Sequence, residues 1–103
     1  MTIATKIAAP GGAARPDIAE RIGEFVALRH EFHANPELAF REKATSLRIA
    51  DLLARWGYRV ERLAETGVIA TLENGTGRSL GIRADIDALP IAEATGLPFA
   101  SRV

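Results

Sequence analysis

Asp85 and Asp87 are the two residues whose type and spacing are best suited to chemistry. They end an apolar run that begins at Leu80 and is stopped by Pro90. Side chains two residues apart on a strand point to the same face, so both acids would share one side if the strand continued. The carboxyl ends of strands in α/β sheets are where ligand crevices form, and paired acids there attract a cation or raise each other's proton affinity. The alternative is that Asp85 caps a turn and Asp87 is a solvated loop acid.

A second group of polar side chains surrounds His30 and His33, which stand three residues apart on a predicted helix. That spacing suits two metal ligands on one helix face, but no third ligand converges on them from the sequence. The structural alternative is that these histidines interact with the last carbonyls of the helix and with its dipole. Arg83 either neutralises Asp85 or Asp87 or lies on the exposed face of its strand. These alternatives stay open at this point.

The composition excludes several function classes. The chain has 103 residues, is 48% hydrophobic and 25% charged, and has no formal net charge, so no basic face is available for nucleic acid. It contains no cysteine, which excludes a disulfide scaffold or a thiolate metal site within it. No apolar run approaches the roughly 20 residues that span a bilayer. We therefore expect a cytoplasmic protein of one domain or less, with neither nucleic acid nor membrane as a partner.

The first part of the chain predicts a tail followed by a helix. Residues 1–16 are rich in alanine, glycine and proline and are expected to be disordered. Asp17 is placed to cap the helix that follows, with Glu20 reaching back in a capping box. The helix should end at Asn35, because the residue before Pro36 is pushed out of helical geometry.

A second helix is predicted over residues 41–56. Gly57 is placed to end it in the left-handed conformation. Its apolar side chains recur at helical spacing and are expected to face inward; they are Leu47, Ile49, Ala50, Leu53 and Trp56.

Strand patterns fill the region after this helix. Residues 58–63 alternate between apolar and polar, and residues 67–73 form a second apolar run. The glycines of the turn at residues 74–77 predict a hairpin to a third strand over residues 79–85, antiparallel to the second. The expected fold class is α/β, with two N-terminal helices followed by a mixed sheet that contains a β-hairpin.

Several ordered motifs resemble one known family. They are Leu28-Arg29-His30-Glu31-Phe32-His33-Ala34-Asn35-Pro36-Glu37-Leu38-Ala39-Phe40, Trp56-Gly57-Tyr58, Thr66-Gly67-Val68, Gly81-Ile82-Arg83-Ala84-Asp85-Ile86-Asp87-Ala88-Leu89-Pro90 and Glu93-Ala94-Thr95-Gly96-Leu97-Pro98-Phe99-Ala100-Ser101. Together they resemble the amidohydrolase branch of the dinuclear metallopeptidases. That branch includes hippurate hydrolases, N-acyl-amino-acid amidohydrolases and plant indole-acetyl-amino-acid hydrolases. The resemblance covers residues 18–103.

The resemblance implies an enzyme that hydrolyses the amide bond of an N-acyl amino acid or small peptide with two divalent ions, Zn, Mn, Co or Ni. The ions would polarise the scissile carbonyl and lower the pKa of a bridging water, and a Glu would act as general base. Asp87 matches a catalytic-site acid of the family, which would orient a metal-ligating side chain. The implied fold is a zinc-peptidase-like α/β catalytic domain, of which residues 17–103 would be the N-terminal part.

The sequence also departs from the family. The resemblance implies that the metal-ligating Cys and His motif and the general base lie beyond Val103, so this chain alone is expected to be inactive and to bind no ion tightly. His33 matches the family motif and is expected to pack or to fix a loop. The alternative function is a small stand-alone α/β binding module without catalytic activity. Homo-oligomerisation is left open.

Overall fold

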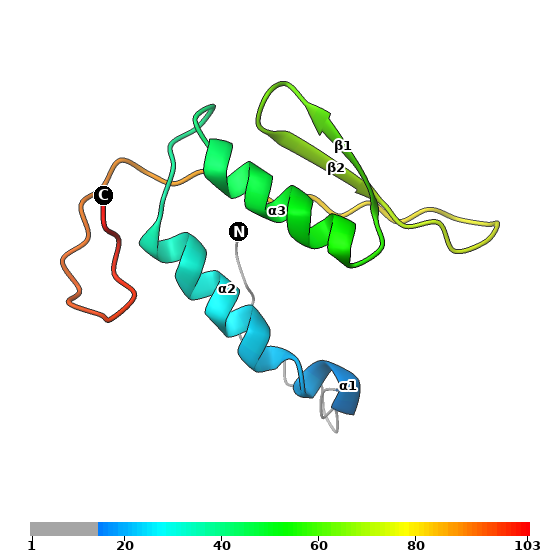
Figure 1. The fold of residues 1–103 in the computed structure, drawn as a ribbon, viewed down its shortest axis with the longest axis horizontal. Helices are drawn as coiled ribbons and strands as arrows, with labels where there is room; N and C mark the ends of the chain where they lie inside the picture. The colour runs from blue at the N-terminus through cyan, green and yellow to red at the C-terminus, as the bar shows by residue number, and fades with distance from the viewer. Residues whose placement is uncertain (1–14) are drawn as a thin grey trace. The chain divides into compact units, whose positions relative to one another are not determined.

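The computed structural model describes residues 15–103 and divides the chain into two compact units. Within the described residues, the first unit contains residues 15–35 and 92–103, and the second runs from Pro36 to Ile91. The first unit holds α1 (Pro16–Ala19) and α2 (Ile22–Ala34), and the second holds α3 (Lys43–Arg55), β1 (Arg59–Leu63) and β2 (Gly67–Thr71) (Figure 1). Helices with an antiparallel pair of strands confirm the α/β class. The disordered tail predicted over residues 1–16 lies outside the described residues, apart from Arg15 and Pro16.

The helix predicted to begin at Asp17 is interrupted. α1 ends at Ala19, and α2 begins at Ile22. Asp17 does not act as the predicted cap, because its carboxylate accepts hydrogen bonds from the Arg15 guanidinium at 3.2 Å instead of from the Glu20 amide. The C-terminal end is as predicted, since Asn35 leaves helical geometry before Pro36.

α3 ends as its sequence predicts and lies beside the β1–β2 hairpin, as Figure 1 shows. Gly57 follows it with φ +89°, a conformation that glycine adopts without steric cost. β1 and β2 pair antiparallel, with Val60 opposite Ala70 and Glu61 opposite Ile69. The strands are joined by a tight turn in which two non-glycine residues, Ala64 and Glu65, have positive φ.

The predicted third strand is absent. Within the described residues, the sheet has two strands, and residues 79–85 form neither strand nor helix. Gly75 and Gly77 do adopt the positive φ expected of a turn. A strand is stable when it buries one face, but Leu80 and Ile82 are 88% and 89% exposed, so no burial offsets the cost of ordering it. The turn residues alone were therefore insufficient to predict pairing.

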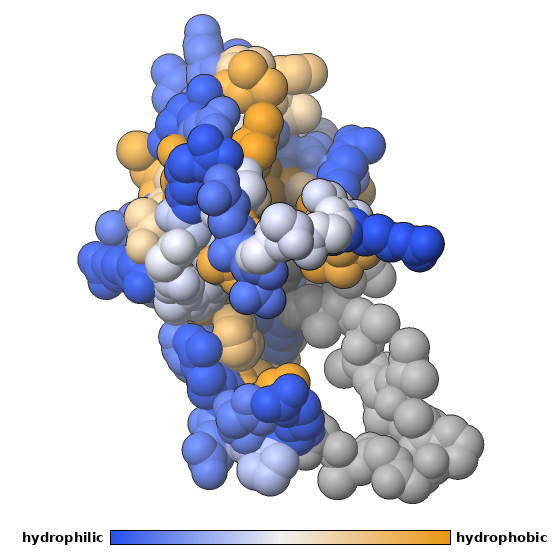
Figure 2. All heavy atoms as spheres, turned by 90° about the vertical axis from the view of Figure 1, so that its right-hand side faces the viewer, coloured by the Kyte–Doolittle hydropathy of each residue, from blue (hydrophilic) through white to orange (hydrophobic). Residues whose placement is uncertain are grey.

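The inward-facing set predicted for α3 is partly wrong. Ile49, Ala50 and Leu53 are half-buried, but Leu47 is 61% exposed and Trp56 is 36% exposed. The most deeply buried side chain of this helix is polar: Ser46 has no exposed surface. Hydrophobic atoms remain visible between polar ones on the surface in Figure 2. In the part of the chain described here, apolar packing is thus shallow.

Candidate functional site

The two predicted site acids lie in the coil after the hairpin. Asp85 accepts a hydrogen bond from Arg83 at 3.1 Å, which settles the partner of that arginine. Asp87 is exposed and immediately precedes Ala88. Because no strand forms here, the two acids are not held side by side on a sheet edge.

The backbone next to Asp87 is fixed to the segment that precedes α3. The Ala88 amide donates to the Glu37 carbonyl at 2.7 Å, and Leu38 forms an isolated parallel bridge with Ala88. These contacts join two motifs that are 50 residues apart in the sequence. They set the backbone position of the residue that follows Asp87, while the Asp87 carboxylate remains open to solvent.

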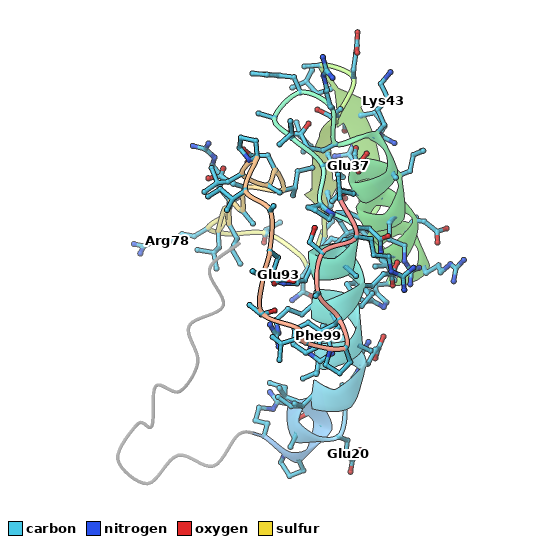
Figure 3. All side chains as sticks on the ribbon, turned by 90° about the vertical axis from the view of Figure 1, so that its left-hand side faces the viewer. Glu20, Glu37, Lys43, Arg78, Glu93 and Phe99 are labelled. Carbon is cyan, nitrogen blue, oxygen red and sulfur yellow. The ribbon has the colours of Figure 1, made fainter. Side chains whose placement is uncertain are left out.

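The Glu37 side chain caps the N-terminus of α3 from outside the helix. Its Oε1 accepts from the Thr45 amide at 2.6 Å and the Thr45 hydroxyl at 2.7 Å, and its Oε2 accepts from the Ala44 amide at 3.2 Å. Figure 3 shows Glu37 near Lys43, where α3 begins. These bonds satisfy amides that have no partner within the helix and place a negative charge at its positive end.

The pKa of Glu37 reflects two opposing effects. Burial raises the pKa of this carboxyl, but hydrogen bonds from Thr45, Ala44 and Lys43 favour the ionised form, and the net result is a pKa below the ordinary value. Sequence reasoning missed this cap. Glu37 is eight residues from Thr45, whereas the usual capping acid is adjacent to the helix start.

Polar side chains, some of them buried, tie the end of β1 and the hairpin turn to the first turn of α3. Arg62 donates to the Ser46 hydroxyl at 2.6 Å and to the Glu65 carbonyl at 3.2 Å. Glu42 is buried, and hydrogen bonds from its own backbone amide and from the Thr66 hydroxyl lower its pKa. Its Oε2 has no hydrogen-bond partner within the described residues. The contacts position the turn of the hairpin on α3.

The two histidines are engaged within the first unit. A ring nitrogen of His33 is hydrogen-bonded to Glu93 Oε1, and Glu93 Oε2 accepts from the Ser101 amide at 2.6 Å. His30 stacks on Phe99 with 3.7 Å between ring centroids and an interplanar angle of 6°. Figure 3 shows Glu93 and Phe99 beside α2. His33 thus has the loop-fixing contact expected from its motif.

These side chains do not form a metal centre. Across residues 15–103, no group of three or more His, Cys, Asp and Glu side chains is arranged to hold an ion. His33 and Glu93 bind each other, and His30 packs on an aromatic ring. The described residues alone therefore do not fit the two divalent ions that the resemblance implies. Likewise, none of the described helices is long and apolar enough to cross a membrane.

Comparison with curated proteins confirms the class that the motifs indicated, since relatives of this chain include a hydrolase and a deacetylase. The hippurate hydrolase of Campylobacter jejuni is 44% identical over 89 residues, which cover 84% of this chain and 23% of that protein. The N-acetyldiaminopimelate deacetylase of Listeria monocytogenes is 37% identical over 84 residues, 79% of this chain and 23% of that protein. The chain is thus a relative of amidohydrolases and spans about a quarter of their length.

One relative carries a different kind of name. A putative glutamate–cysteine ligase of Rhodococcus jostii is 43% identical over 81 residues, but the match covers 10% of that protein. The segment similar to this chain is therefore only a small part of the protein that this name describes. No protein-family model matches the chain, and no solved structure matches it.

Proposed function

We propose that this chain is part of a metal-dependent amidohydrolase that cleaves N-acyl amino acids or small peptides, and that it does not catalyse the reaction by itself. The observation that supports this proposal is the similarity of about four-fifths of the chain to the Campylobacter hippurate hydrolase and the Listeria deacetylase. Hippurate is benzoylglycine, and the second name specifies an acetylated diamino acid. Both compounds have an amide bond between an acyl group and an amino acid, which defines the proposed substrate class.

Asp87 is the proposed site residue of this chain. Its carboxylate is exposed, and the backbone of the next residue is anchored to Glu37. A fixed backbone with a free carboxylate suits an acid that orients another side chain by hydrogen bonding. The active protein would use two divalent ions, Zn, Mn, Co or Ni, with ligands supplied outside the described residues.

A chimera tests the proposal. The segment of the Campylobacter hippurate hydrolase that matches this chain is replaced by the matching 84% of this chain, and hydrolysis of hippurate is measured. We expect an active chimera. Asp87→Asn should lower its kcat by about 10- to 100-fold, because an amide binds and orients a metal-ligating side chain less strongly than a carboxylate.

Asp85→Asn in the same chimera is the matched control, since Asp85 is bound to Arg83 and should change kcat less than about threefold. The chain of 103 residues, assayed with each ion on N-benzoyl and N-acetyl amino acids, should show no hydrolysis above the ion alone. A folded, metal-loaded chimera without activity would contradict the proposal, as would an Asp87→Asn variant that equals its parent.

The second candidate is a small binding module without catalytic activity. It is favoured by the exposed apolar side chains near the end of the second unit, which include Leu80, Ile82, Leu89 and Ile91. Exposed apolar side chains of this kind favour association with a partner. Hydrolysis by the chimera, lost in Asp87→Asn, would decide against this candidate.

A further inference from the structure

The coil before Asp87 presents an unpaired backbone with an alternating side-chain pattern. Within the described residues, no backbone–backbone hydrogen bond involves residues 79–87. Ile82 is 89% exposed, and the side chains of Arg83 and Asp85 are 90% and 68% exposed. The 3.1 Å contact between Arg83 and Asp85 places both side chains on the same side, as in a strand, where residues two apart share a face.

The sequence of this coil is complementary to itself in the antiparallel direction. When residues 81–87 of two copies are paired about Ala84, Arg83 of each copy stands opposite Asp85 of the other. In the same register, Ile82 stands opposite Ile86, and Gly81 opposite Asp87. Apolar residues therefore meet apolar residues on one face, and opposite charges meet on the other. A parallel in-register pairing would instead place each arginine opposite an arginine.

We propose that residues 81–87 form an intermolecular antiparallel strand pair between two copies of this chain. An exposed edge with free N–H and C=O groups is a template for such pairing, and opposite charges in facing positions stabilise it. The absence of net charge removes the long-range repulsion that would keep copies apart. Pairing stops at Ala88, whose amide already donates to Glu37. The proposal does not depend on the amidohydrolase assignment.

The test distinguishes the proposed Arg83–Asp85 pairs between two copies from the Arg83–Asp85 contact within one copy. The full chain is studied by sedimentation equilibrium over a range of concentrations, where the wild type should approach twice its 11.1 kDa mass. Arg83→Asp makes both facing positions acidic, and Asp85→Arg makes both basic. Each variant alone should dissociate at least about tenfold more readily, because two attractive pairs become repulsive. An equimolar mixture of the two should regain the wild-type affinity.

A control mixture accounts for attraction between chains of opposite net charge. Arg78→Asp and Glu73→Arg change the net charge by the same amounts but lie outside the paired residues, so their mixture should behave as the wild type does. Circular dichroism shows whether each variant keeps its helices. A wild type that stays monomeric overturns the proposal. So does a mixture of Arg83→Asp and Asp85→Arg that fails to associate, or an oligomer that is insensitive to all four changes and hence held by apolar contact alone.

Discussion

Glu37 joins two parts of the second unit through different atoms. Its carboxylate caps α3, and its carbonyl accepts from the amide next to Asp87. A residue with both contacts couples the start of the helix to the position of the proposed site acid. A substitution at Glu37 removes the carboxylate that caps α3. It leaves the hydrogen bond from the Ala88 amide possible, because that bond is made to the backbone carbonyl of residue 37.

We predict that Glu37→Ala destabilises the second unit by about 1–2 kcal/mol, the usual cost of removing a helix cap. Glu37→Gln should cost less, because it keeps one acceptor oxygen but loses the negative charge at the helix end. The measurement is urea unfolding followed by the fluorescence of Trp56, the single tryptophan. Glu73→Gln is the control, since the Glu73 side chain is 81% exposed. Equal stability of Glu37→Ala and wild type would show that the cap contributes nothing.

The elements that were predicted correctly from sequence are those with local determinants. Pro36 ends α2 through its own sterics, and Gly57 supplies the left-handed residue after α3. The third strand was predicted from its apolar run and from the turn before it, but pairing also requires a buried face, which Leu80 and Ile82 lack.

The site was less predictable because its contacts are distant in sequence. Glu93 lies 60 residues from His33, and the sequence around either residue does not indicate that the two side chains are in contact. Asp87 was identified through its motif, and its side chain is exposed in the coil that precedes Ala88.

At the scale of one element, residues 92–103 form a loop that is held on α2 by an ionised carboxylate. The hydrogen bond from His33 lowers the pKa of Glu93, partial burial opposes this, and the Ser101 amide lowers it further, leaving the pKa below its ordinary value of 4.5. The folded state therefore binds the proton at Glu93 less readily than the unfolded state does. The resulting stability is present above about pH 4.5 and is lost as the pH falls through the lowered pKa.

We predict that acidification below pH 4.5 releases this loop from α2. Amide hydrogen exchange of Ser101 and Arg102, whose N–H groups donate to Glu93 and to the Ala34 carbonyl, should accelerate there beyond the intrinsic pH effect. Glu93→Gln should already show fast exchange near neutral pH and little further acceleration. Protection of Ser101 that is independent of pH in the wild type, or unchanged in Glu93→Gln, would contradict this view.

At the scale of the whole described chain, exposed apolar side chains outnumber buried ones. Ala34 is the buried hydrophobic residue of residues 15–103, whereas Leu80, Ile82 and Leu89 are each at least 72% exposed. Stability then rests on polar contacts such as Arg62 with Ser46 and on half-buried apolar groups. Exposed apolar groups add little to the free energy of folding, but they provide surface through which the chain can associate with a partner.

We predict that the double change Leu80→Ser and Ile82→Ser alters the free energy of unfolding by no more than about 0.5 kcal/mol, because both side chains are solvated before and after unfolding. The half-buried Leu53 supplies the contrast: Leu53→Ala should cost about 1–2 kcal/mol, less than a fully buried leucine. Urea unfolding measures both. Binding of the apolar dye ANS at a dilution that keeps the chain monomeric should fall in the double variant and persist in Leu53→Ala. A large loss of stability in the double variant would mean that residues 79–87 pack against the rest of the chain in solution.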